Sequence, residues 1–92
     1  MACRRPESAE EEAKSFADLP GTHEAMKVDL CSLESVRTFS QEFLKKHTKL
    51  DGLVCNAGAV FPGSPKVLTK DGLERTMAIS YFGHFLLSLI HI

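Results

Sequence analysis

The chain has 92 residues, of which 43% are hydrophobic and 25% are charged, and its formal net charge is −1. This length allows one small domain or a part of a larger one, and the near-neutral charge excludes a broad basic surface for nucleic acid. Near the N-terminus, Arg4, Arg5 and a run of glutamates stand where a signal peptide would have its apolar core.

The first half of the chain predicts helices that alternate with short strands. Residues 1–3 form a stub, and Pro6 opens a helix whose early glutamates suit the positive end of a helix dipole. Leu19-Pro20-Gly21 ends this helix, and residues 25–30 predict a short strand. Ser32 is then expected to cap a second helix. The predicted buried stripe of that helix consists of Leu33, Val36, Phe39, Phe43 and Leu44.

The second half contains the most informative segment. The apolar run Leu50–Cys55 predicts a strand buried on both faces, and Asn56-Ala57-Gly58 follows it as a small, bare corner. In an open parallel sheet, the loop that leaves the carboxyl end of a strand binds the ligand. A tight turn after a core strand is the alternative. A glycine- and proline-rich loop extends to Pro65, and Asp71 is expected to cap a third helix.

This order of elements predicts an α/β fold with a parallel sheet and right-handed crossovers. The segment from Thr76 to Ile92 carries no formally charged side chain. It is at the lower limit of length for a membrane-spanning helix and is interrupted by polar residues, so we expect no membrane span. A helix buried against a sheet or a partner subunit is the favoured interpretation.

Cysteine and histidine usage limits the chemistry. Cys3, Cys31 and Cys55 are an odd number of cysteines, and two of them lie in or beside apolar runs. This favours reduced, buried thiols and hence a reducing compartment, either the cytoplasm or a cytosol-facing membrane surface. The four histidines lack ligand spacing with one another or with the cysteines, so we expect no metal site.

Five segments together resemble the short-chain dehydrogenase/reductase family, particularly its retinol-dehydrogenase-like branch and the WW-domain oxidoreductases. They are residues 2–5, 28–36, 53–58, 68–74 and 83–87. The resemblance covers nearly the whole chain but only an interior part of such a domain, from the end of its second strand to the long helix after its fourth. It implies an interior fragment of a doubly wound Rossmann-type parallel sheet. Residues 1–92 would be a partial NAD(P)-binding domain that lacks the glycine-rich loop and the catalytic Tyr-x-x-x-Lys segment.

The same resemblance implies a set of cofactor-binding residues. Asn56-Ala57-Gly58 resembles the family's Asn-Ala-Gly motif, which backs the cofactor and stabilises the central sheet. Asp29 and Leu30 resemble the pair that contacts the adenine, and Ile79 completes this group. A purely structural role at the entry of the second helix is the alternative for Asp29.

Arg4 and Arg5 stand just past the second strand, where the family selects its nicotinamide cofactor. A carboxylate at this place binds a free ribose 2′-hydroxyl, whereas a guanidinium binds the 2′-phosphate of NADP. No acid accompanies the two arginines, so NADP(H) is expected in preference to NAD(H). A solvated pair of arginines is the alternative.

Three departures from the family pattern argue against activity of this chain. The glycine-rich turn that binds the pyrophosphate is absent, so no cofactor is expected to bind tightly. The catalytic Ser and the Tyr-x-x-x-Lys pair are absent too, since Tyr81 is followed four positions later by Phe85. Ser80 occupies the position of an auxiliary asparagine that holds a water in the family's proton relay, and serine has fewer donors and a shorter reach.

The functional expectation is therefore a fragment of an NADP(H)-dependent oxidoreductase that interconverts an alcohol and a carbonyl on a small-molecule substrate. A retinoid or a steroid is the substrate that the resemblance suggests, and we expect this chain to be inactive by itself. The alternative is a non-catalytic, truncated isoform that forms homo- or hetero-oligomers through its apolar C-terminal helix, residues 73–92. A glycine-rich segment upstream and a Tyr-x-x-x-Lys segment downstream would favour the enzyme, and a genuine stop codon after Ile92 would favour the alternative.

Overall fold

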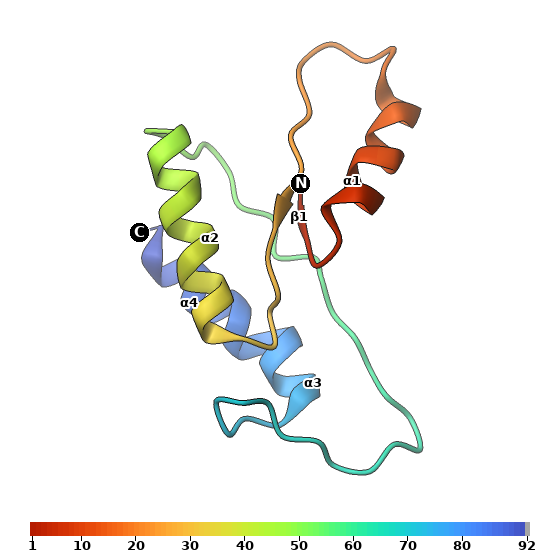
Figure 1. Ribbon diagram of the computed structural model, residues 1–92, viewed down its shortest axis with the longest axis vertical. Helices are drawn as coiled ribbons and strands as arrows, with labels where there is room; N and C mark the ends of the chain where they lie inside the picture. Colours follow the sequence, from red (N-terminus) through yellow and green to blue (C-terminus); the bar gives the residue numbers. More distant parts are fainter. Residues whose placement is uncertain (92) are drawn as a thin grey trace.

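The computed structural model describes residues 1–91 as a pair of short strands with helices on both sides (Figure 1). The elements in chain order are β1 (Ala2–Cys3), α1 (Pro6–Ala13), the 3₁₀-helix η1 (Lys14–Phe16), β2 (Met26–Lys27), α2 (Leu33–Lys46), α3 (Arg75–Met77), the π-helix η2 (Ala78–Phe82) and α4 (Gly83–Ile90). The first half of the chain thus has the predicted order of strand, helix, strand and helix.

The strands β1 and β2 are parallel, with Ala2 opposite Met26 and Cys3 opposite Lys27. A further backbone hydrogen bond, from Val28 N to Cys3 O at 2.9 Å, extends the pairing beyond β2. The helix α1 connects the two strands and lies on one side of them, while α2 and α4 lie on the other (Figure 1). The predicted α/β arrangement around a parallel sheet is therefore confirmed.

The core lies between β2, α2 and α4. Its buried apolar cluster consists of Val28, Val36, Phe39 and Leu87. Burial of one such side chain stabilises a fold by about 1.5–3 kcal/mol, so this small cluster is what holds α2 and α4 together. The predicted stripe of α2 is wrong for Leu44, which is 50% exposed. Leu44 lies one residue beyond Phe43, which is about 100° around the helix and outside the arc that faces α4.

The helix α2 begins where the sequence predicts. Ser32 Oγ accepts a hydrogen bond from Ser35 N at 3.2 Å, as a serine N-cap does. Its C-terminal turn contains two basic residues, Lys45 and Lys46, which suit the negative end of the helix dipole. The first helix also begins at Pro6 as predicted, although its last turn tightens into η1.

The third helix begins later than predicted and has a different cap. The carboxylate of Glu74, and not that of Asp71, accepts hydrogen bonds from the backbone N–H groups of Thr76 and Met77. Asp71 Oδ2 instead accepts a hydrogen bond from Leu33 N at 3.0 Å. The acid therefore binds the positive end of α2, where a helix dipole favours a negative charge, and docks the loop before α3 onto that helix.

The predicted strand Leu50–Cys55 is wrong for this structure, because residues 50–60 have no regular secondary structure. Val54 is 87% exposed, and Cys55 is exposed although a buried thiol was expected. A strand needs a neighbour to accept and donate its ladder hydrogen bonds. Within residues 1–91 no segment pairs with this stretch, so it crosses the molecule as an extended, irregular segment (Figure 1).

The arrangement is open. Its accessible surface is 6779 Å² and its radius of gyration is 14.4 Å, whereas a compact domain of this mass and length has about 5,300 Å² and about 12 Å. Part of the excess is apolar surface on the long C-terminal helix, where Tyr81 and Phe85 are each 53% exposed. Among residues 1–91, the helices are too short or too polar for any of them to cross a bilayer.

Candidate functional site

A cavity of about 300 Å³ opens at the carboxyl ends of β1 and β2. Its lining residues are Ala2, Cys3, Arg4, Val28, Asp29, Leu30, Ala57, Gly58, Ala59, Phe61 and Ile79. They come from the ends of both strands, from the loop after residue 56 and from the π-helix η2. In open α/β sheets this is the edge at which ligands bind.

Most of the predicted cofactor-binding residues meet at this cavity. Arg4, Asp29, Leu30, Ala57, Gly58 and Ile79 line it, while Arg5 and Asn56 do not. Arg5 is exposed and stands at the N-cap of α1, where its backbone oxygen accepts a hydrogen bond from Ser8 N. Asn56 is exposed on the irregular segment. The geometry thus assembles a ligand-sized space from residues that are far apart in the sequence.

Asp29 has a clear structural role at the entrance of α2. Its Oδ1 accepts a hydrogen bond from Cys31 N at 2.9 Å, and its own backbone N–H donates to Ser35 Oγ at 2.9 Å. The structural role at the entry of α2, which was the alternative for Asp29, is therefore present. The same side chain also lines the cavity, so its carboxylate can accept a hydrogen bond from a ligand there.

Two arginines lie near the cavity, since Arg4 lines it and Arg75 contacts the lining residue Phe61. Burial raises the pKa of the Cys31 thiol, and the neighbouring Asp29 carboxylate raises it further. The guanidinium groups of Arg4 and Arg75 act in the opposite direction on the same thiol. Two cations from distant parts of the chain thus lie close enough to Cys31 to influence its ionisation, and both are near the cavity.

The long C-terminal helix holds the loop of the Asn-Ala-Gly motif in place. His84 Nε2 donates a hydrogen bond to Ala57 O at 2.6 Å, because a carbonyl oxygen can only accept. The other ring nitrogen of His84 is buried and has no partner in the described part of the chain. Next to this contact, a Cβ added at Gly58 would lie 3.7 Å from Ser80 Oγ.

The sequence did not single out Phe61 and Arg75. Phe61 lines the cavity, and the Arg75 guanidinium carbon lies 3.5 Å from the centroid of its ring. A buried N–H without an acceptor costs about 1–3 kcal/mol, and Arg75 Nε is such a group within residues 1–91. The available signal was an aromatic residue in a loop otherwise rich in glycine and proline. Nothing in the sequence paired it with Arg75.

Ser80, the predicted counterpart of the auxiliary asparagine, lies in the π-helix η2 and is exposed. In this helix the backbone N–H of Gly83 donates to Ala78 O, five residues earlier. Such π-turns occur frequently at functional sites. Here the turn orients two side chains: that of Ile79 lines the cavity, and that of Ser80 lies next to Gly58.

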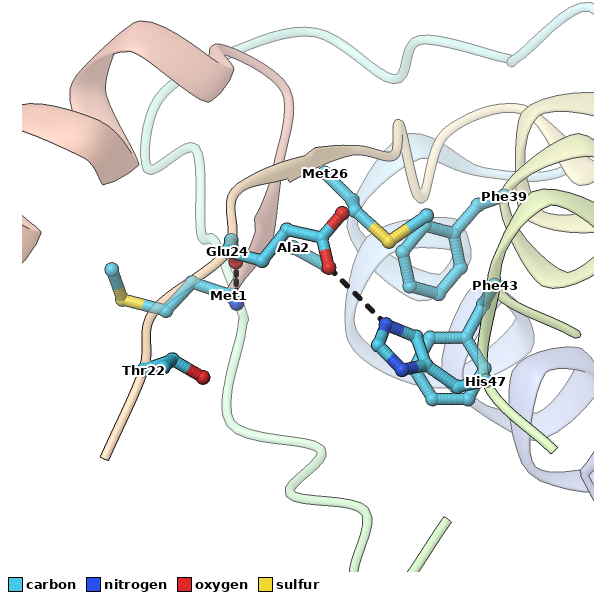
Figure 2. Close-up of a pocket in the computed structure, with 8 residues that line it drawn as sticks. All are labelled: Met1, Ala2, Thr22, Glu24, Met26, Phe39, Phe43 and His47. Atoms are coloured by element: carbon cyan, nitrogen blue, oxygen red, sulfur yellow. Dashed lines mark hydrogen bonds and ion pairs between the residues drawn. The ribbon is translucent and has the colours of Figure 1, made fainter. Parts of the chain in front are cut away.

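A second cavity, of about 250 Å³, lies at the amino end of the same strands. Figure 2 shows its wall of Met26 and Phe39 and the Glu24 carboxylate turned toward His47, with the Glu24–His47 contact at 3.1 Å. Predicted site residues are absent from its lining, and it lies at the edge of the sheet opposite to the ligand edge. Its contacts instead tie the chain before β2 to the C-terminal end of α2.

The first cavity suits a nucleoside more than a metal ion or a whole dinucleotide. Its volume lies at the lower end of the range for small-molecule sites. Apolar walls from Leu30 and Ile79 and bare backbone at Ala57 and Gly58 accept a flat base, while Arg4 offers paired donors for a phosphate. In the described part of the chain, no cluster of histidine, cysteine and acidic residues could hold a metal ion.

Comparisons with known proteins identify the family and the fold of the chain. A family model described as short chain dehydrogenase matches residues 1–91. A chloroplastic protochlorophyllide reductase from Chlamydomonas reinhardtii is 42% identical over 89 residues, which cover 96% of this chain and 22% of that protein. Short-chain dehydrogenase/reductase prx1 from Penicillium roqueforti is 48% identical over 68 residues, which cover 74% of this chain and 19% of that protein.

Among solved structures, the chain is similar to an uncharacterised protein from Mycobacterium paratuberculosis, with a TM-score of 0.79 and 33% sequence identity. The superposition covers 98% of this chain and 30% of that one. It confirms the predicted fold class, a part of a Rossmann-type α/β sheet, over nearly the whole chain. The chain spans only about a fifth of the length of the curated relatives it matches.

Proposed function

Since the chain belongs to the short-chain dehydrogenase/reductase family of oxidoreductases, we propose that its cavity binds the adenosine end of NADP(H). The observation that carries this proposal is the meeting of Arg4, Asp29, Leu30, Gly58 and Ile79 around one space at the ligand edge of the sheet. In an oxidoreductase that contains this segment, the bound cofactor supplies or accepts the hydride.

Each lining residue has a distinct task in this proposal. The guanidinium of Arg4 forms paired hydrogen bonds with the ribose 2′-phosphate, which distinguishes NADP from NAD. The Asp29 carboxylate accepts a hydrogen bond from an amino group of the base. Gly58 carries no side chain, so the ribose can approach the backbone closely. Leu30 and Ile79 enclose the base and remove apolar surface from water.

For the complete reaction we propose reduction of a small-molecule substrate, since one of the similar proteins is named as a reductase of protochlorophyllide. The alcohol/carbonyl pair, a retinoid or steroid substrate, and membership of the retinol-dehydrogenase-like branch remain predictions. The residues of this chain do not choose among them, because the family places its catalytic Tyr-x-x-x-Lys pair later in the domain.

Binding of half-cofactors to the 92-residue chain tests the proposal. Adenosine 2′-monophosphate and adenosine 5′-monophosphate are titrated to millimolar concentration while amide shifts are followed by NMR, with the largest changes expected at Leu30, Gly58 and Ile79. A bidentate charged contact is worth about 1.5–3 kcal/mol, so the 2′-phosphate should bind about tenfold to a hundredfold more tightly. Arg4→Gln should abolish the difference.

The control is Arg37→Gln, which removes an exposed arginine of α2 that does not line the cavity. This variant should keep the preference for the 2′-phosphate. If neither nucleotide shifts the cavity amides at millimolar concentration, the proposed function is wrong. If the two nucleotides bind with equal affinity, the cavity binds adenosine but does not distinguish a 2′-phosphate from a 5′-phosphate.

One observation favours a second function, the association of this chain with another copy or with a longer relative. Met77, Tyr81, Phe85 and Leu89 recur every four residues, and each is about half exposed. This spacing places them on one face of the C-terminal helix. We propose that this stripe buries itself against the same helix of a second chain, which would be the interaction function expected from residues 73–92.

Sedimentation velocity over a range of concentrations tests this second function. The substitution Phe85→Glu places a charge in the middle of the stripe and should shift the chain toward monomer. Leu44→Glu is the matched control, because Leu44 has a similar exposed fraction but lies on α2. Equal association of both variants and the unmodified chain would rule out the stripe as the contact.

A further inference from the structure

The loop that carries Phe61 is anchored at both of its ends. At its start, Ala57 O accepts the hydrogen bond from His84 Nε2 at 2.6 Å. At its end, Val67 O accepts a hydrogen bond from Arg75 N at 2.9 Å. The residues between these anchors form no helix or strand. Their conformation is fixed by a turn, in which Ser64 N donates to Phe61 O at 3.1 Å, and by contacts of their side chains.

One such side-chain contact is between Phe61 and Arg75. The guanidinium carbon lies 3.5 Å from the centroid of the ring, well inside the distance of about 6 Å within which a cation is attracted to an aromatic face. Within residues 1–91, Arg75 forms no salt bridge, and its Nε donor has no acceptor. The ring therefore orients this guanidinium, and the guanidinium in turn covers one face of the ring and restrains it.

The ring fixed in this way is part of the wall of the cavity. Phe61 faces the same space as Leu30 and Ile79. It remains 37% exposed although Arg75 covers one of its faces. An aromatic surface that is left open beside two apolar side chains suits a flat heterocycle, because nucleobases stack on aromatic side chains.

We propose that Phe61 is the surface on which the purine base of the nucleotide stacks and that Arg75 is the residue that positions it. This inference rests on the proposed function, since it assigns a further part of the same site. Arg75 does not contact the ligand. It acts by holding the ring, and with it the middle of the loop, in the orientation that closes one side of the cavity.

The contact between the two side chains is testable without a ligand. In the NMR spectrum of the 92-residue chain, the ring current of Phe61 should move the side-chain protons of Arg75 upfield, and Phe61→Leu should return them to ordinary positions. Unshifted Arg75 protons in the unmodified chain would overturn the positioning role directly.

Stacking is tested with a fluorescent ring. The chain contains no tryptophan, so F61W introduces a single fluorophore at the wall of the cavity. Adenosine 2′-monophosphate should quench its emission, whereas ribose 5-phosphate, which has a phosphate but no base, should not. Quenching by both compounds or by neither, in a chain whose amide shifts show that the nucleotide binds, would overturn stacking.

The role of Arg75 is tested by affinity. Loss of the cation should weaken nucleotide binding about three- to tenfold in Arg75→Gln, as expected for one cation–π contact. Arg75→Lys keeps a cation and should restore most of the affinity, a rescue that a mere packing role does not predict. Arg37→Gln again serves as the control. Binding that is unchanged in Arg75→Gln overturns the inference but leaves the proposed function intact, whereas absence of nucleotide binding to the unmodified chain overturns both.

Discussion

Gly83 is the position where the C-terminal helix approaches the site most closely. A Cβ added there would lie 2.8 Å from Leu30 O, 3.0 Å from Leu30 Cβ and 3.0 Å from Ala78 O. Two of these three atoms belong to the backbone, so they cannot move away by a change of rotamer. The substitution Gly83→Ala must therefore push α4 away from the chain that follows β2.

Two opposing terms set the magnitude of this effect. Alanine in place of glycine in a helix is favourable by about 1 kcal/mol, while overpacking of a close contact costs about 1–3 kcal/mol. Because the atoms in contact include backbone, the cost should lie in the upper part of its range. We expect a net local destabilisation of about 1–2 kcal/mol, which is about a 5–30-fold change in the opening equilibrium.

Amide hydrogen exchange of α4 measures this local opening without any assumption about global unfolding. Residues 84–90 should exchange faster in Gly83→Ala by the factor above. The matched control is Gly52→Ala, since no heavy atom lies within 4 Å of the Cβ that it would add. Exchange of α4 in this control should stay within about twofold of the unmodified chain, because the substitution creates no new contact.

The opposite outcome is clearly defined. If the amides of α4 exchange at the same rate or more slowly in Gly83→Ala, then helix propensity outweighs the contact. The helix would then lie farther from Leu30 O than the distance of 2.8 Å from the added Cβ implies. The conclusion that Gly83 sets the packing of α4 would be wrong.

Three further predictions concern ionisation and activity. The pKa of the Glu24 carboxyl is lowered from 4.5 by its hydrogen bond with Lys46 and, next, by that with His47. The stabilisation of the fold by this carboxylate is therefore present above pH 4.5 and is lost as the pH falls through the lowered pKa. Glu24→Gln should remove this part of the acid dependence of helix content. Burial raises the pKa of the Cys31 thiol above 9.0, so iodoacetamide should alkylate it more slowly at pH 8 than the exposed Cys55, and equal rates would contradict this. Residues 1–92 contain no Tyr-x-x-x-Lys pair, so the purified chain should not oxidise NADPH with retinal, and sustained turnover would show that other residues perform the proton transfer.

What the sequence could predict depended on the range of the interactions. Ser32 was predicted correctly as a helix cap, because a serine cap needs only the backbone N–H of a residue three positions later. The same reasoning failed for Asp71, whose side chain accepts from Leu33 N, 38 residues earlier in the chain. The carboxylate had two helix N-termini within reach, and only the tertiary fold decides which of them it caps.

Leu50–Cys55 shows a second limit. Its apolar composition predicts a strand, yet composition states only what the segment would form beside a suitable neighbour. The two strands that do form are joined by backbone hydrogen bonds between residues 1–3 and 26–28. Residues 50–60 have no such neighbour in the described chain and stay extended and exposed.

The candidate site is assembled nevertheless, and the C-terminal helix explains how. That helix reaches each segment of the site by a different contact: His84 holds Ala57, Arg75 holds Phe61, and Gly83 lets the backbone pack against Leu30. None of these three contacts depends on strand pairing by residues 50–55. The loop of the Asn-Ala-Gly motif therefore reaches its place through side chains of the helix that follows it. Substitutions on the inner face of this helix should disturb the cavity more than substitutions in the irregular segment that leads into it.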